Sequence, residues 1–236
     1  KKDTKNFINT IDKALLYAIL LGLPACAGLV LLSEELIITL FQYDAFDALS
    51  AKKTSLSLQA YGSGLIAFIA IKIFAPIFLS RGDTKTPVKA GVVAMVSNIV
   101  LNLILVQYYD HVGLAAATSI SALINAVILY FFLAKQSIFK FNNAFYEMLI
   151  KVIFATIIMI LYIYYFDSRT SIDHRDWQIF NDSVRLAAEY ARDQKFMLYL
   201  DSSLLERAIL VSKTITISVA IYFLSLYTLG VRLKQL

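Results

Sequence analysis

The sequence VKAGVVAMVSNIVLNLILVQ (Val88–Gln107) is followed, after Tyr108–His111, by VGLAAATSISALINAVILYFFLA (Val112–Ala134), and this pair of apolar runs decides the fold. Each run has the length of about 20 residues that an α-helix needs to cross the hydrocarbon core of a bilayer. Four further runs of similar length lie at Ala14–Leu32, Ser55–Leu79, Ala144–Phe166 and Ala208–Gly230. The sequence therefore predicts an all-α polytopic membrane protein with six transmembrane helices.

The composition excludes a water-soluble protein. Hydrophobic residues make up 59% of the 236 residues, and the mean hydropathy is +0.68. The chain starts at Lys1 without Met and without a signal-peptide pattern, which favours a start inside a longer protein. A single cysteine, Cys26, excludes a disulfide within the chain. No Cys or His pair has metal-ligand spacing, so neither a metal site nor a cofactor is predicted.

The charges in the loops predict how the helices are oriented. With six spans the loops fall into two sets, and one set is rich in Lys and Arg: Lys1, Lys2, Lys5, Lys13, Arg81, Lys85, Lys89, Lys135, Lys140, Arg232 and Lys234. The other set carries Lys52 and Lys53 against Glu34, Glu35, Asp44, Asp47 and Asp110. The positive-inside rule places the basic set and both chain ends in the cytoplasm. The net charge of +5 reports this orientation and not nucleic-acid binding.

The chain divides into four parts along its length. Residues 1–13 are interpreted as a cytoplasmic segment, and residues 14–134 as a unit of four spans. Residues 135–143 form a cytoplasmic loop. Residues 144–236 hold two further spans, joined by a polar external loop at 167–206 that we expect to be partly helical.

Lys72 is the outstanding residue of the second span. A lysine near the middle of a membrane helix is costly unless it faces a polar cavity or extends its side chain to the interface. Both alternatives stay open, because Arg81 and the cytoplasmic surface lie only about two turns away. A role in a polar cavity is the favoured hypothesis.

Two amides in the third span and two prolines also predict special environments. Asn98 and Asn102 are four residues apart and project from one helix face, so they need partners on another helix or in a water-filled path. Pro24 and Pro76 remove backbone donors and predict helix bends. The carbonyl that Pro24 frees must find a partner in lipid, whether the bend is a moving part or only a packing feature.

The connection Ser80–Lys89 is predicted to be a tight link between two helices, since it combines a Gly turn, an Asp-Thr cap signal and a proline. Its basic residues could also serve only as topology anchors.

No nucleophile, phosphate loop or metalloprotease motif stands out, and no catalytic residue is predicted. The span centres lack Asp and Glu, which disfavours proton pumps and intramembrane hydrolases. A transporter of an anionic ligand fits the positive charges of Lys72 and Arg81 better.

The order of residues in this connection resembles one known family. Arg81, Asp83, Lys85, Thr86, Pro87 and Lys89 occur together with Tyr61-Gly62-Ser63-Gly64, Lys72 and Ala75-Pro76. This combination resembles the MurJ (MviN) family of bacterial lipid II flippases, within the multidrug/oligosaccharidyl-lipid/polysaccharide exporter superfamily. The resemblance covers Leu15 to Ala134.

The resemblance implies helices nine to fourteen of a fourteen-helix flippase that works by alternating access in the bacterial cytoplasmic (inner) membrane. The substrate and partner would be lipid II, with a cationic cavity for its pyrophosphate-sugar head. The spans at Ala144–Phe166 and Ala208–Gly230 would form a groove for the lipid tail. The other partners would be membrane lipids and the remaining amino-terminal helices of the same protein. Alternatives are a drug, cation or polysaccharide-lipid exporter of the same superfamily, an intramembrane enzyme, and a purely structural helix bundle.

Overall fold

The computed structural model describes residues 2–41, 46, 48–136, 143–170 and 194–231, and all the elements in these ranges are helices. They are α1 (Lys2–Leu31), α2 (Ser33–Phe41), α3 (Ala48–Ser63), α4 (Leu65–Ser80), α5 (Lys85–Lys135), α6 (Asn143–Thr170) and α8 (Gln194–Thr228). The predicted all-α class is confirmed.

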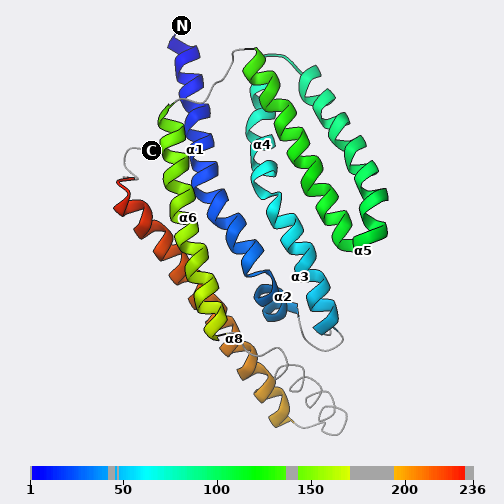
Figure 1. The fold of residues 1–236 in the computed structure, drawn as a ribbon, viewed down its shortest axis with the longest axis vertical. Coiled ribbons are helices and arrows are strands. Elements are labelled where there is room, and N and C mark those ends of the chain that lie inside the picture. Colours follow the sequence, from blue (N-terminus) through cyan, green and yellow to red (C-terminus); the bar gives the residue numbers. More distant parts are fainter. Residues whose placement is uncertain (1, 42–45, 47, 137–142, 171–193, 232–236) are drawn as a thin grey trace.

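The helices provide the six predicted membrane crossings. Five stretches of the described residues are long and apolar enough to span a bilayer, and the longest is the 51-residue α5. The α5 backbone reverses at Asp110, where φ is 50° and ψ is −132°, so this element consists of two antiparallel arms (Figure 1). A Cβ atom on Gly113 would collide with the backbone carbonyl of Leu105, which explains why the turn needs glycine there.

The α1 helix lies between two groups of helices (Figure 1). On one side, α1 contacts α3 and α4, which in turn pack against α5; on the other side it contacts α6, which packs against α8. The start of α1 and the α4–α5 connection lie at one end of the bundle, and α2 and the Asp110 turn lie at the other (Figure 1). This two-ended arrangement matches the division of the loops into two sets.

Some boundaries differ from the prediction. The polar residues 1–13 lead directly into the first span, because α1 is continuous from Lys2. The second span was predicted to begin at Ser55, but helix already begins at Ala48. The early turns of α3 carry Lys52 and Lys53, which lower the hydropathy, yet Lys52 forms an ion pair of 2.7 Å with Glu34 of α2. Of the predicted loops, residues 137–142 and 171–193 lie outside the described residues.

A helix break at Gly64 separates α3 from α4. The Gly64 N–H donates to the Tyr61 carbonyl, so the Ala60 carbonyl is left without its usual helical donor. The hydroxyls of Ser63 (2.8 Å) and Ser119 (2.6 Å) donate to this carbonyl instead. Because Ser119 belongs to the second arm of α5, its hydrogen bond ties the break to a neighbouring helix.

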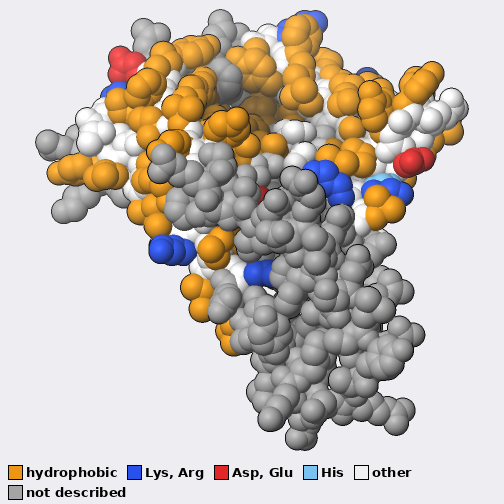
Figure 2. Space-filling view, turned by 60° about the horizontal axis from the view of Figure 1, so that its bottom comes forward, with side chains coloured by type: hydrophobic (Ala, Val, Ile, Leu, Met, Phe, Trp, Pro, Cys, Tyr) orange, Lys and Arg blue, Asp and Glu red, His pale blue; other side chains and the backbone are white. Residues whose placement is uncertain are grey.

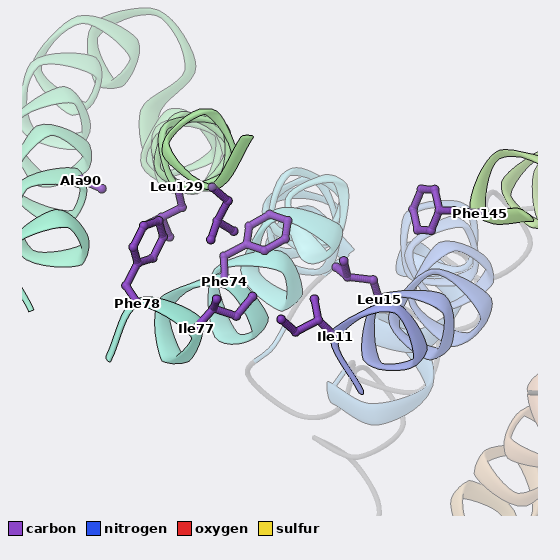
Figure 3. Packing of buried hydrophobic residues seen from close by; sticks show 9 residues of the cluster. Ile11, Leu15, Phe74, Ile77, Phe78, Ala90, Leu129 and Phe145 are labelled. Carbon is purple, nitrogen blue, oxygen red and sulfur yellow. The ribbon is translucent and has the colours of Figure 1, made fainter. Parts of the chain in front are cut away.

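The core near the α4–α5 connection is apolar and joins four helices, α1, α4, α5 and α6 (Figure 3). Phe74, Ile77 and Phe78 of α4 lie between α1 and α5, and Phe78 is fully buried. The other buried members of this cluster are Ile11, Leu15, Ala90, Leu129, Leu133 and Phe145.

Apolar side chains also cover much of the outer surface (Figure 2). The first arm of α5 alone exposes Val88, Val92, Met95, Val96, Ile99, Val100, Leu103 and Ile104. A protein in water rarely exposes so large an apolar surface, whereas lipid tails or further apolar helices cover it at no cost. The chain is therefore a multi-pass membrane protein.

Candidate functional site

The Lys72 side chain is exposed on α4. It makes no hydrogen bond or ion pair with any residue that the structure describes. Eight residues separate it from Ser80, which places it about 12 Å along the helix from the α4–α5 connection. At this depth the Lys72 ammonium group can face a polar cavity inside the protein, or its side chain can extend to the membrane interface.

An open pocket with a mostly apolar lining lies beside α4, between it and the two arms of α5. Its volume is about 280 Å³, and its lining is Phe68, Ile71, Ala94, Met95, Asn98, Thr118, Ser121, Ala122 and Asn125. Asn98 therefore faces the second arm of α5 as well as α4. Lys72 and Asn102 are not part of the lining, so the structure does not bring the four predicted cavity residues into one site.

The amides near this pocket have unused hydrogen-bonding capacity. The Oδ1 atoms of Asn98, Asn102 and Asn125 are buried without a hydrogen-bond partner among the described residues. The hydroxyls of Thr118 and Ser121 donate to carbonyls of their own helix, at 2.9 Å each. The pocket has room for water, which would satisfy the amides of Asn98 and Asn125 in its lining.

The connection from Arg81 to Thr84 is a tight turn held by backbone and side-chain hydrogen bonds. The carbonyl of Phe78 accepts the N–H groups of Arg81 and Asp83, each at 3.0 Å. Gly82 adopts a φ of 77°, which favours glycine. The turn leaves Arg81, Lys85 and Lys89 exposed on one end of the bundle.

Asp83 acts as the N-terminal cap of α5. Its Oδ1 atom accepts the N–H groups of Lys85 (3.1 Å) and Thr86 (3.0 Å), and its Oδ2 atom accepts the Thr86 hydroxyl (2.6 Å). Pro87 lies in the first turn, where a missing N–H removes no helical hydrogen bond. The motif Asp83-Thr84-Lys85-Thr86-Pro87 therefore encodes a helix start and fixes the direction of the first α5 arm.

The capping bonds give stability that depends on pH. Chiefly the Thr86 hydroxyl, then the backbone N–H groups and the Gln136 side chain, lower the pKa of Asp83 by hydrogen bonding to its charged form. Because the folded pKa lies below the unfolded value, this contribution is complete above about pH 4 and is lost as the pH falls through the folded pKa.

We therefore expect Asp83→Asn to lower the melting temperature at pH 7 by a few degrees, and the difference from wild type to disappear on acidification. Thermal unfolding in detergent between neutral pH and pH 3 would measure it. Asp110→Asn, at the opposite end of the first α5 arm, is the matched control. If the difference in melting temperature between Asp83→Asn and wild type stays constant with pH, the Asp83 charge has no role in this stability.

Both prolines predicted to bend helices lie inside continuous helices, Pro24 in α1 and Pro76 in α4. The carbonyl that Pro24 deprives of its donor belongs to Leu20, four residues earlier. That carbonyl accepts a hydrogen bond of 2.6 Å from the hydroxyl of Tyr222 in α8. The expectation that the freed carbonyl needs a partner is confirmed.

Several polar residues of these sites were not predicted as site residues. Thr118, Ser121 and Asn125 join Asn98 only because α5 folds back on itself. Tyr222 was grouped with an apolar span. Within the described residues there is no cluster of His, Cys, Asp or Glu that could hold a metal ion.

Comparison with known proteins gives one consistent match. The sequence model of the family described as "Lipid II flippase MurJ" matches residues 1–179. A "Probable lipid II flippase MurJ" of Vibrio cholerae is 34% identical over 230 residues, which cover 98% of this chain and 39% of that protein. A protein of the same description from Haemophilus influenzae is 39% identical over 165 residues, or 70% of this chain and 32% of its own length.

A solved structure shares the fold. "Lipid II flippase MurJ, inward closed conformation" matches with a TM-score of 0.64 and 23% identity, over 95% of this chain and 39% of that one. This chain thus spans about two fifths of the length of the Vibrio cholerae protein and of the solved structure.

Proposed function

Because this chain belongs to the MurJ family of lipid II flippases, we propose that its six spans are helices nine to fourteen of a transporter that moves lipid II. The transporter carries this peptidoglycan precursor from the inner to the outer leaflet of the bacterial cytoplasmic membrane by alternating access. It performs no chemical catalysis. The basic loops and both ends of the six spans face the cytoplasm, in keeping with the positive-inside rule.

The observation that carries the proposal is the free positive charge of Lys72. Its side chain is exposed on a helix at membrane depth and has no partner among the described residues. An anionic head group such as a pyrophosphate supplies the partner that the protein lacks. Arg81, exposed at the end of the same helix, lies where such a head group would first arrive from the cytoplasm.

The α6 and α8 helices take the lipid tail in this proposal. Both expose large apolar side chains, among them Ile150, Phe154 and Leu161 on α6 and Leu224 on α8. They attach to the bundle mainly through α1 and α2. A pair of helices at the edge of the bundle can hold a hydrocarbon chain without breaking the contacts among α3, α4 and α5.

A drug or cation exporter of the same superfamily is less well supported, because the centres of the six spans carry no Asp or Glu to bind a cation. An intramembrane enzyme would need a polar catalytic cluster, and the polar groups that line the pocket between α4 and α5 are amides and hydroxyls.

Complementation tests the proposed function. Cells depleted of their own lipid II flippase would express the full-length protein, either unchanged or with Lys72→Ala or Arg81→Ala. We expect the unchanged protein to restore growth and each variant to fail at normal membrane levels, with lipid II accumulating on the inner leaflet. Lys72→Arg should retain growth, because it keeps the charge.

Lys53→Ala is the matched control, since Lys53 is an exposed lysine of α3, a helix that has no binding role in this proposal. It should leave growth unchanged. Growth of both Lys72→Ala and Arg81→Ala at the wild-type rate would remove these residues from the transport route. Failure of the unchanged protein to support growth would overturn the flippase function itself.

A further inference from the structure

The hydrogen bond from Tyr222 to Leu20 replaces a bond that α1 cannot make by itself. In a regular helix the N–H of residue 24 would donate to the carbonyl of residue 20, but Pro24 has no N–H. In the hydrocarbon core no water can take its place. The Tyr222 hydroxyl donates to the Leu20 carbonyl at 2.6 Å, across 202 positions of sequence.

The surroundings of this bond are dry. Tyr222 is 1% exposed and lies in a cluster of buried residues from α1, α6 and α8. The other buried members of the cluster are Leu20, Leu32, Val152, Ala155, Met159, Ile163, Leu226 and Val231. The hydroxyl and the carbonyl therefore depend on each other.

The bond also links two helices that are not among each other's main packing partners. The main packing partners of α8 are α6 and α2, whereas α1 packs against α6, α4 and α3. The Tyr222 hydroxyl ties α8 to Leu20 of α1, whose carbonyl lacks a donor from its own helix because of Pro24. Any change in the bend of α1 at Pro24 moves the acceptor of this bond.

We infer that Tyr222 is a positioning residue that couples the place of α8 to the bend of α1 at Pro24. The bend and α8 then move together, and they separate only when this hydrogen bond breaks. If α8 holds a lipid tail, as in the proposed function, a tail that enters the groove and shifts α8 also changes the bend of α1. The coupling itself does not rest on that function.

A double-mutant cycle tests the first half of this inference. The full-length protein in lipid nanodiscs would carry Tyr222→Phe, Pro24→Ala, or both. Tyr222→Phe should lower the melting temperature by several degrees, because the Leu20 carbonyl loses its donor. With Pro24→Ala, the new N–H of residue 24 donates to Leu20, so the same Tyr222→Phe change should cost much less. Equal losses in both backgrounds would reduce Tyr222 to a packing residue and overturn the inference.

A distance measurement tests the second half and needs no proline variant. Spin labels at Tyr17 on α1 and Leu224 on α8, both exposed, would be introduced with Cys26→Ala in a full-length background free of other cysteines. Double electron–electron resonance should give a narrow distance distribution in the otherwise unchanged protein and a broader or shifted one with Tyr222→Phe. Tyr227→Phe, on the exposed side of α8, should change neither measurement. An unchanged distribution with Tyr222→Phe would overturn the positioning role, whether or not the protein transports lipid II.

Discussion

Phe78→Ala is expected to destabilise the protein by about 3 kcal/mol or more, the range typical of removing a fully buried phenylalanine. Phe78 is 0% exposed and packs in the cluster that joins α4 to α1 and to both arms of α5. Removal of its ring leaves a cavity where three helices meet. Lipid cannot fill this cavity, because the surrounding side chains close it.

The same substitution should also loosen the turn after α4. The Phe78 carbonyl accepts the N–H groups of Arg81 and Asp83, so displacement of this residue moves the acceptor for both. Thermal unfolding would measure the first effect, and faster hydrogen exchange at the amides of Arg81 and Asp83 would report the second. Leu79→Ala is the matched control, since Leu79 is 52% exposed and should cost little. Similar losses for Phe78→Ala and Leu79→Ala would contradict this description of the core.

Gly64→Ala should separate α4 from the second arm of α5. A Cβ atom at position 64 would lie 2.9 Å from the Ser119 Cα and 2.7 Å from its Cβ, against about 3.5–4.0 Å for an ordinary carbon contact. Backbone atoms are involved, so a side-chain rotation cannot relieve the overlap. The helices must move apart, which stretches the hydrogen bond from Ser119 to the Ala60 carbonyl. We expect a loss of about 1–3 kcal/mol.

Gly91→Ala is the control for this prediction, because nothing lies within 4 Å of a Cβ atom there. An alanine in the middle of a helix is favoured over glycine by about 0.5–1 kcal/mol, so this variant should be neutral or slightly more stable. Melting temperatures of the two variants in nanodiscs would give the comparison. If Gly64→Ala is as stable as Gly91→Ala, the close approach of α4 to α5 is not required.

The spans could be predicted because their signal is local. An apolar run of about 20 residues has few alternatives to a membrane helix, and all six predicted runs lie in helices. The start of α3 was not predicted, because Lys52 and Lys53 lower the local hydropathy below that of a membrane span. The ion pair between Lys52 and Glu34 that accommodates one of these charges exists only in the folded protein.

The sites were predicted only in part, because each combines residues that are close in sequence with a partner that is far away in sequence. Asn98 and Asn102 stand on one helix face by spacing alone, but nothing in their spacing indicates that Asn125 would come close to Asn98. Pro24 predicts an unpaired carbonyl, yet its donor lies in a span of many similar aromatic and aliphatic residues. Only the fold selects Tyr222 from among them.

The long sequence separation between Leu20 and Tyr222 has a consequence for how the protein is made. A ribosome delivers α1 to the membrane about two hundred residues before it delivers α8. During that interval the Leu20 carbonyl has no built-in partner inside the bilayer, and a chain halted before Tyr222 keeps this defect. Arrival of α8 therefore completes the hydrogen bonding of α1.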